Sequence, residues 1–240
     1  MASIHSPWIK PIEARIIGEM KLDPSTVALW HFDEGIDGAL GILHDASIYE
    51  NNGILAAAPN TPTWVDGQIG KALDFDGNDY TRHPFHASMN IRDEFTWISW
   101  IYPDANFNGY ILSKGGQYQI QVAMPQNGIW CQFYNAAALF PSRCTAPAIA
   151  MNTWWRIGVT LNTPGLPIIY INGEPATAYA YRNAVPGPID AGVGDLYIGK
   201  DLVVVTPYYG KLDEMILSNR CYSHSEMRAD YRRSPLAKTI

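Results

Sequence analysis

The chain has 240 residues, of which 47% are hydrophobic and 17% charged, and its formal net charge is −6. This composition is typical of a folded domain and excludes a chain that is disordered over most of its length. Lysine and arginine are scattered, with only Arg232 and Arg233 adjacent, which argues against nucleic-acid binding because that function needs a clustered basic face. No apolar run has the length of a transmembrane helix, so we expect neither nucleic acid nor membrane as a partner.

Residues 1–25 predict an arm outside the main domain. Pro7, Pro11 and Pro24 interrupt the segment, and helical periodicity there extends over only one or two turns near residues 13–20. The segment has no apolar run of signal-peptide length, so export by that route is not expected. Its apolar side chains would suit docking to a neighbouring copy or subunit, since an arm can become ordered on binding.

Residues 26–232 predict one all-β domain, an antiparallel β-sandwich of the jelly-roll type. Short runs with apolar-polar alternation are separated by clusters of Gly, Pro, Asn and Asp. In chain order the expected strands are TVALWHF (26–32), KALDF (71–75), FTWISWIY (95–102), YILSK (110–114), YQIQVAM (118–124), IWCQFYN (129–135), WWRIGVTLN (154–162), PIIYI (167–171), DLYIG (195–199) and KLDEMILS (211–218). Asn172-Gly173 is the strongest hairpin signal. A short helix is expected over residues 223–232, before a tail of residues 233–240.

Three cysteines, Cys131, Cys144 and Cys221, are an odd and sparse set. Such a set is a poor disulfide framework, so we expect buried thiols. A bond between Cys131 and Cys144 stays open if their strands lie side by side.

Several segments resemble, in the same order, the laminin-G-like branch of the concanavalin A-like lectin/glucanase jelly rolls, in particular its bacterial and viral members. They are ALWHFDEG (28–35), HDASIYENNGIL (44–55), WVDGQIGKALDFDGNDY (64–80), FTWISWIYP (95–103), TWWRIGVTLN with IYINGEP, and LYIG with YGKLDEMILSNRCYSHSEMRADY. The resemblance covers about residues 26–232. That family includes sugar-binding modules, adhesion domains and structural parts of virions, and related jelly rolls include glycosidases and lyases, so the fold alone does not give the function.

Catalysis is not expected. A glycosidase needs two carboxylates that face one sugar, and no Glu here is followed by Asp at i+2, the arrangement of the related glucanases. Asp213 and Glu214 are adjacent, and adjacent side chains of a strand point to opposite faces. There is no G-x-S-x-G nucleophile motif. A glycosidase or polysaccharide lyase therefore remains a distant alternative.

A structural calcium ion is the metal to consider. The run DFDGNDY gathers acidic and amide side chains, although such residues also form turns by bonding their own backbone. The resemblance implies one calcium between the first and last strands, with Asp213, Asp76 and Asp33 as candidate ligands and nearby carbonyls completing the oxygen shell. In the alternative, Asp213 faces a backbone turn and Glu214 lies on the other face of the strand.

A candidate ligand face combines two neighbouring strands. Alternation places Gln119 and Gln121 on one face, and places Trp130, Gln132 and Tyr134 on the corresponding face of the next strand. Amides bond hydroxyl groups and aromatic rings stack on apolar sugar edges, so the face suits a glycan. The alternative is a sheet face covered by a loop or by another subunit. His83 and His86 are expected at the surface or in a loop rather than as a metal pair.

Two functions follow. The first is a non-catalytic structural or adhesive subunit of a virion, such as a phage decoration or tail-adhesion protein, assembled as a homo-oligomer or with particle neighbours through residues 1–25. The second is a carbohydrate-binding module of a secreted or cell-surface protein. The expected partner is a glycan or host-surface polysaccharide, and the expected location is a virion surface or the extracellular space.

Overall fold

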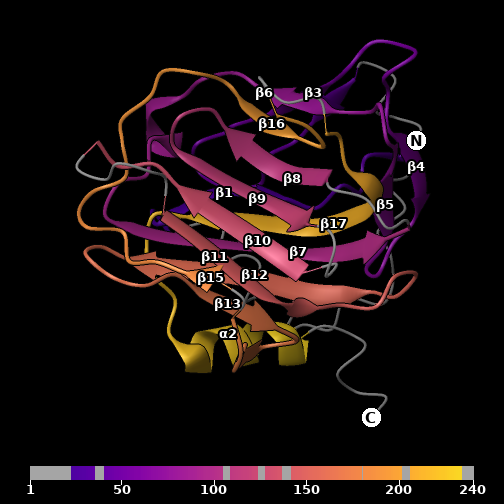
Figure 1. The fold of residues 1–240 in the computed structure, drawn as a ribbon. Helices are drawn as coiled ribbons and strands as arrows, with labels where there is room; N and C mark the ends of the chain where they lie inside the picture. Colours follow the sequence, from indigo (N-terminus) through magenta and orange to yellow (C-terminus); the bar gives the residue numbers. More distant parts are fainter. Residues whose placement is uncertain are drawn as a thin grey trace.

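Two antiparallel β-sheets pack face to face in the computed structural model (Figure 1). The structure describes residues 23–35, 41–104, 109–123, 128–136, 142–179, 181–201 and 206–233. Most of the predicted arm, residues 1–22, and most of the predicted tail, residues 234–240, lie outside this part of the chain. The predicted all-β antiparallel sandwich with a short C-terminal helix is confirmed.

Sheet A contains eight of the described strands. In spatial order they are β14 (Glu174–Pro175), β13 (Ile168–Ile171), β12 (Trp155–Asn162), β7 (Glu94–Pro103), β17 (Tyr209–Ser218), β5 (Lys71–Asp76) and β4 (Thr63–Asp66), with β1 (Thr26–Trp30) also paired to β17. The last strand thus lies beside the first, so residues far apart in the sequence meet at β17.

Sheet B contains nine of the described strands. In spatial order they are β15 (Tyr181–Arg182), β11 (Ser142–Ala148), β10 (Gly128–Phe133), β9 (Tyr118–Ala123), β8 (Gly109–Lys114), β16 (Leu196–Ile198), β6 (Thr81–His83), β3 (Gly53–Leu55) and β2 (Ile42–Leu43). The described helices are the 3-10 helix η2 (Ala87–Met89) and the α-helix α2 (His224–Arg233).

All ten strands predicted from alternation are present, and the helix predicted over residues 223–232 is α2. Alternation did not identify the shorter strands β2, β3, β4, β6, β14 and β15 or the longer β11. The segment of β11, SRCTAPA, is made of small residues and contains a proline. It therefore lacks both the branched or aromatic side chains and the alternation that identify a strand.

The core lies between the sheets and is rich in aromatic residues. Trp30, Phe75, Phe95, Trp97 and Phe133 are completely buried in one cluster. Strands β9 and β10 contribute through alternate residues, as their patterns predict. Cys131 is also buried there, and it lies opposite Cys144 in the register of β10 and β11.

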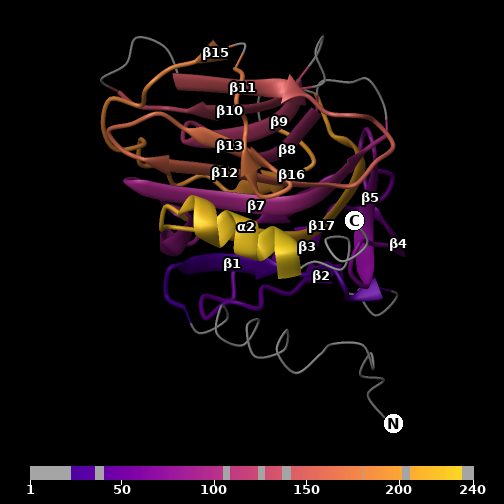
Figure 2. The ribbon, with the colours of Figure 1, turned by 90° about the horizontal axis from the view of Figure 1, so that it is seen from below.

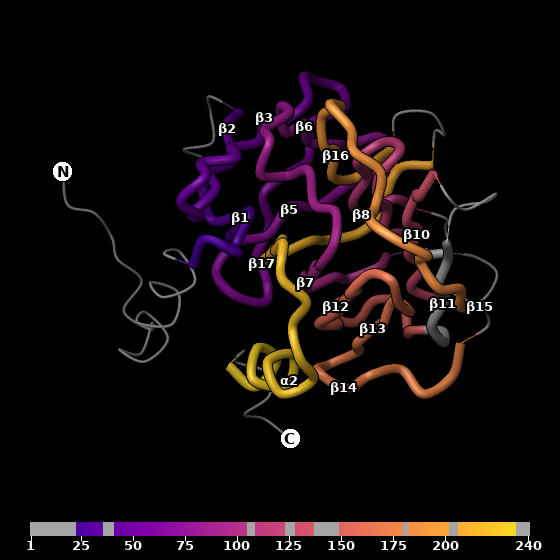
Figure 3. Tube along the Cα trace, turned by 90° about the vertical axis from the view of Figure 1, so that its left-hand side faces the viewer, coloured from indigo at the N-terminus to yellow at the C-terminus, as the bar shows by residue number. Residues whose placement is uncertain are grey.

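Helix α2 covers part of the outer side of sheet A, below β7 and β12 in Figure 2 and beside β14 in Figure 3. Met227 from the helix packs in a second apolar cluster with Ile98, Tyr170 and Ile216 from the sheet. Gly158 in β12 makes this approach feasible, because a Cβ there would overlap the end of the Met227 side chain.

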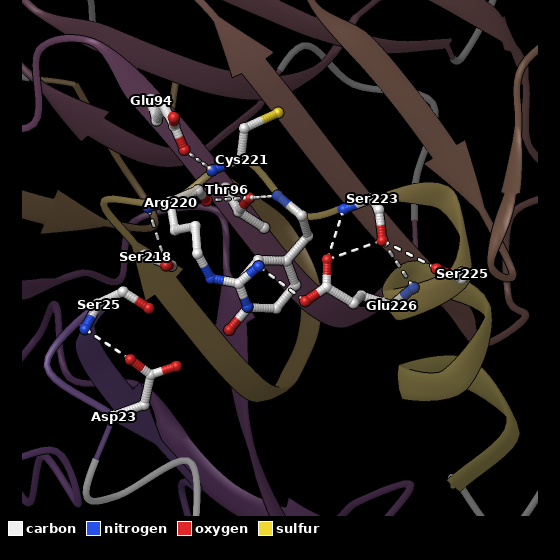
Figure 4. Close-up of polar contacts among 11 residues, drawn as sticks. Asp23, Ser25, Glu94, Thr96, Ser218, Arg220, Cys221, Ser223, Ser225 and Glu226 are labelled. Atoms are coloured by element: carbon white, nitrogen blue, oxygen red, sulfur yellow. Dashed lines mark hydrogen bonds and ion pairs between the residues drawn. The ribbon is translucent and has the colours of Figure 1, made fainter.

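The entry to α2 is fixed by hydrogen bonds from both sides (Figure 4). The backbone N–H and hydroxyl of Ser223 donate to Glu226 Oε2 at 2.7 and 2.8 Å, and Arg220 donates to Glu226 Oε1 at 2.7 Å. Ser223 and Glu226 have the S-x-x-E spacing of a capping box. The preceding loop is tied to β7, since the Thr96 hydroxyl donates to the Arg220 carbonyl at 2.6 Å and accepts from the Tyr222 N–H at 2.9 Å.

We expect Ser223→Ala to lower the free energy of unfolding by about 1 kcal/mol, because the first turn of α2 loses its cap. Chemical denaturation measures this change. The matched control is Ser225→Ala, two residues further along the chain. Among the described residues, the Ser225 hydroxyl hydrogen-bonds only to the hydroxyl of Ser223. Equal losses in the two variants would contradict the capping role.

Candidate functional site

The predicted ligand face forms on the outer side of sheet B. In the register of β9 and β10, Gln119 lies opposite Gln132 and Gln121 lies opposite Trp130, as predicted. The row continues into β8, where Ser113 lies opposite Gln119. The side chains between them point inward and build the core, so the alternation inferred for these strands is confirmed.

The amides of this face are buried. The exposed fractions are 5% for Gln119, 8% for Gln121 and 4% for Gln132, whereas Trp130 and Tyr134 are half-buried. The expectation that these amides are available to a glycan is therefore corrected, because they are buried. Only its two aromatic side chains are substantially accessible.

Asp201 explains part of this burial. It follows β16, is 7% exposed, and accepts hydrogen bonds from the Ser113 hydroxyl and, at 3.1 Å, from Gln119 Nε2. Tyr134 reaches the same group, with its hydroxyl 3.4 Å from Gln119 Oε1. At Gln119 the face is therefore covered by the loop that carries Asp201, as the alternative predicted. The hydrogen-bond network of Ser113, Gln119 and Asp201 lies directly beside the accessible Tyr134.

Sequence reasoning missed Ser113 and Asp201. Alternation in YILSK does not identify Ser113, because the register of β8 shifts between Tyr110 and Leu112 and Ile111, two residues before Ser113, is buried in the core. Asp201 lies in a loop, where side-chain direction has no period, and its place over the sheet follows only from tertiary structure.

The acidic pair of the last strand forms a second cluster, at the junction of β1, β5 and β17. The register of β17 against β7 shifts between Asp213 and Ile216, and Glu214 has a positive φ of 48°. This is a β-bulge, which interrupts the two-residue alternation. The core residues Leu212 and Met215 flank the pair, and both carboxylates lie on the side away from the core. The expectation that Glu214 occupies the opposite face is wrong because of this bulge.

Two carboxylates of this cluster bind the turn between β4 and β5. Asp213 Oδ2 accepts from the N–H of Ile69 at 2.8 Å, and Asp33 Oδ1 accepts from the N–H of Lys71 at 2.7 Å. Gly67 and Gly70 allow this approach, since a Cβ at either position would meet a carboxylate oxygen. The predicted alternative, that Asp213 faces a backbone turn, is therefore confirmed. The close approach of the two carboxylates explains why WVDGQIG has glycine at both positions.

His31 and Glu214 form the third part of the cluster. His31 Nδ1 lies 2.9 Å from both Glu214 carboxylate oxygens. Burial lowers the pKa of His31, but the hydrogen bond and the charge of Glu214 outweigh it, so the pKa lies above its usual value. His31 and Glu214 thus share a partly buried hydrogen bond, and this bond becomes stronger when the imidazole is protonated.

Asp213 is the most perturbed acid of the cluster. Burial, together with the charge of Glu214, raises the pKa of Asp213 to about 8. Its Oδ1 is buried and has no hydrogen-bond partner among the described residues. Such an oxygen suits the role of a single carboxylate ligand to a cation.

The described side chains do not gather around that oxygen as a full metal site. No group of three or more His, Cys, Asp or Glu side chains in the described part of the chain has the geometry to hold a metal ion. Asp33 contacts the same turn as Asp213, whereas Asp76 lies opposite Tyr209, four residues from Asp213 and thus about 13 Å along the strand. Calcium at Asp213, Asp76 and Asp33 stays a prediction, with Asp213 as the side chain that best fits it.

We expect Gly70→Ala to destabilise the fold by more than the cost of its positive φ. Gly116, in the turn between β8 and β9, is a matched control: its φ is 73° against 66° for Gly70, and a Cβ there meets nothing within 4 Å. Alanine at Gly116 should cost about 1–2 kcal/mol from backbone strain alone. Gly70→Ala should cost about 1–3 kcal/mol more, because it also displaces Asp33 from the turn. Equal losses on thermal unfolding would show that Asp33 does not restrain the turn.

His83 and His86, the two histidines considered as a metal pair, have structural positions. The expectation of a surface or loop place is wrong for His83, which is completely buried in β6 with its ring 4.3 Å from that of Trp30. Burial lowers the pKa of His83 to about 3, so the ring is neutral at physiological pH. His86 is exposed and caps η2, accepting from the N–H of Ser88.

Comparison with known proteins identifies the family. Residues 75–228 match the family model described as the concanavalin A-like lectin/glucanases superfamily. The chain belongs to this superfamily. No curated protein matches the sequence. Among the described residues, none of the helices is long and apolar enough to cross a membrane.

Solved structures of this superfamily's fold resemble the chain at low sequence identity. The binding domain of Paraclostridial Mosquitocidal Protein 1 has a TM-score of 0.68 at 14% identity over 87% of this chain and 52% of its own. Domain 4 of AbnA, a GH43 extracellular arabinanase from Geobacillus stearothermophilus, in complex with arabinotriose, has a TM-score of 0.64 at 16% identity over 85% and 97%. The botulinum neurotoxin serotype G binding domain has a TM-score of 0.64 at 15% identity over 86% and 50%. The chain therefore spans about half the length of the two toxin fragments and nearly all of the arabinanase domain.

Proposed function

We propose that this chain is a non-catalytic carbohydrate-binding module that works outside the cell. The observation that carries the proposal is the outer face of sheet B, where Trp130 and Tyr134 are half-buried beside the Ser113–Gln119–Asp201 network. A sugar ring stacked on the aromatic side chains would place its hydroxyl groups next to amide and carboxylate acceptors. A similar fold in the extracellular arabinanase, solved with arabinotriose, supports this class of ligand.

A binding role also agrees with the state of the acidic residues. The carboxylates of Asp33 and Asp213 bind backbone amides of a turn, and Glu214 binds His31. A glycosidase would need two carboxylates on opposite sides of one sugar bond, whereas each of these three makes a hydrogen bond within the protein.

The comparisons favour this module over the virion subunit that the sequence analysis placed first. The similar solved structures described above are binding domains of toxins and a domain of an arabinanase. The virion hypothesis rests on an arm of which residues 1–22 lie outside the described part. Its test is the mass in solution by light scattering with and without residues 1–25: an oligomer that becomes a monomer on truncation supports assembly through the arm.

We expect Trp130→Ala to weaken glycan binding by about tenfold or more, as loss of a central aromatic contact does at binding surfaces. A glycan array that includes arabino-oligosaccharides finds the ligand, and titration calorimetry measures its affinity. Trp154→Ala is the matched control, because Trp154 is also half-buried but packs near Tyr102, with ring centroids 5.4 Å apart, at sheet A. Absence of any glycan ligand would overturn the proposal, and equal affinity in the Trp130 variant would overturn the site.

Calcium at Asp213 is a separate proposal. The buried Oδ1 of Asp213 without a hydrogen-bond partner among the described residues supports it, since calcium binds carboxylate and carbonyl oxygens. When bound, the ion would neutralise the carboxylate and hold the turn between β4 and β5 against β17.

A further inference from the structure

A second group of aromatic and charged side chains lies on the outer face of sheet B, beyond β8. We call it the tyrosine–lysine platform and define it as Tyr80, Arg82, Asp195, Tyr197 and Lys200. Tyr197 in β16 lies opposite Arg82 in β6, and the other three residues flank these short strands. Arg82 is exposed and the other four residues are half-buried, so solvent reaches part of every platform side chain.

The two tyrosines and the lysine form one unit. The ring centroids of Tyr80 and Tyr197 are 6.2 Å apart with planes tilted by 51°. Lys200 Nζ lies 3.3 Å from the centroid of Tyr80 and 5.0 Å from that of Tyr197. The two rings therefore hold an ammonium group at a fixed position on the surface by cation–π attraction.

The charges of the platform do not balance. Asp195 Oδ2 accepts from Arg82 NH1 at 2.9 Å, and Asp195 Oδ1 accepts from the N–H of Phe85 at 2.8 Å. Both oxygens of the only platform carboxylate are thus engaged. Among the described residues no carboxylate forms an ion pair with Lys200, which leaves one net positive charge on the five platform residues, in a chain whose formal charge is −6.

The platform is continuous with the aromatic and amide face. Tyr197 lies opposite Ser113, and Ser113 lies opposite Gln119. With neighbouring strands about 4.8 Å apart, Tyr197 and Gln119 are separated by about 10 Å. One extended ligand on the sheet can therefore contact both places.

We propose that the tyrosine–lysine platform binds a sugar residue that carries a carboxylate, so that the preferred ligand is an acidic glycan. This inference rests on the proposed carbohydrate-binding function and adds its ligand class. The remaining guanidinium donors of Arg82 and the ammonium of Lys200 bind the carboxylate, while the exposed part of the tyrosine rings packs on the C–H face of the sugar. An acidic peptide would satisfy the charges, but the paired tyrosine rings favour a flat, partly apolar sugar ring.

The test compares acidic and neutral probes that differ only in the charge. Calorimetry with an oligogalacturonate and its methyl ester, and with sialyllactose and its methyl ester, gives the ratio of affinities for each pair. For at least one pair we expect the wild type to bind the acidic member about tenfold tighter, and added NaCl to shrink this preference through screening. In Arg82→Gln/Lys200→Gln the ratio should fall to about one.

Lys71→Gln is the matched control, since Lys71 is an exposed lysine on sheet A paired with Asp66, and it should keep the wild-type ratio. A thermal melt verifies that each variant is folded. An unchanged ratio in the double variant, or competition by polyglutamate equal to that of the acidic sugar, overturns the inference. Neutral and acidic glycans bound equally by the wild type also overturn it while the proposed function stands, whereas a protein that binds neither kind of glycan contradicts the proposed function itself.

Discussion

Asp230→Ala is expected to lower the free energy of unfolding by about 3–5 kcal/mol, because it leaves a guanidinium buried without its partner. Arg156, 4% exposed, donates to both Asp230 oxygens, from Nε at 2.7 Å and from NH2 at 3.0 Å. Its NH1 donates to the Glu214 carbonyl at 2.7 Å. One side chain from β12 therefore ties helix α2 to the bulge in β17, and removing Asp230 weakens both attachments.

The size of this effect depends on burial, so an exposed pair is the control. Asp66, whose side chain is 92% exposed, bonds Lys71 Nζ at 2.7 Å, and Asp66→Ala should leave the free energy of unfolding close to the wild-type value, because solvent screens the pair. The double variant Arg156→Met/Asp230→Leu should recover most of the loss, because the buried charge is then absent. Urea unfolding of the four proteins measures these differences. A loss below about 1 kcal/mol in Asp230→Ala would show that water reaches Arg156.

The sandwich could be predicted because its long strands carry the alternation that burial on one face requires. In β10, for example, Ile129, Cys131 and Phe133 are completely buried, and the residues between them form the outer face. The pairing of β9 with β10, and thus the neighbourhood of Gln119 and Gln132, could be predicted because the sequence PQNG that separates the two strands is short and typical of a turn. Strands without this pattern, such as β11, were found only in the structure.

The state of the candidate site could not be predicted from local pattern. Alternation gives the face of a side chain, but the burial of Gln119 depends on Asp201, which arrives from a loop after β16. The bulge at Asp213 and Glu214 likewise has no local signal: it lies where one neighbour of β17 changes from β5, which pairs up to Leu212, to β1, which pairs from Met215. A bulge places one extra residue on a strand, and this single residue turned a pair expected on opposite faces into one acidic cluster.

The stability of the protein is expected to fall as the pH rises from about 5 to 8, and Asp213→Asn should reduce this slope. Burial and the charge of Glu214 raise the pKa of Asp213 to about 8, whereas in the unfolded chain an aspartate has a pKa of about 3.9. Between these values the folded protein holds a proton that the unfolded chain has released. The free energy of unfolding then decreases with pH, by at most about 1.4 kcal/mol per pH unit for this group. Asparagine keeps an oxygen for the Ile69 N–H and carries no titrating charge, so the variant should exceed the wild type in stability at pH 8.

A further variant, His31→Gln, and the response to calcium separate the two groups that titrate in the same pH range. The raised pKa of His31 also gives stability below its unfolded pKa that is lost as the pH rises through the folded value, so His31→Gln removes that contribution alone. Calcium adds a second readout: if it binds the ionised Asp213, it raises the melting temperature of the wild type at pH 8, with no effect on Asp213→Asn and an undiminished effect on His31→Gln. Parallel pH profiles of the wild type and Asp213→Asn would contradict the raised pKa. A calcium response retained in Asp213→Asn would exclude this carboxylate as the ligand. Because ionisation of Asp213 is costly in the unliganded protein and favoured by a bound cation, the pH slope should end, and the calcium response should appear, as the pH rises through the pKa of Asp213, about 8.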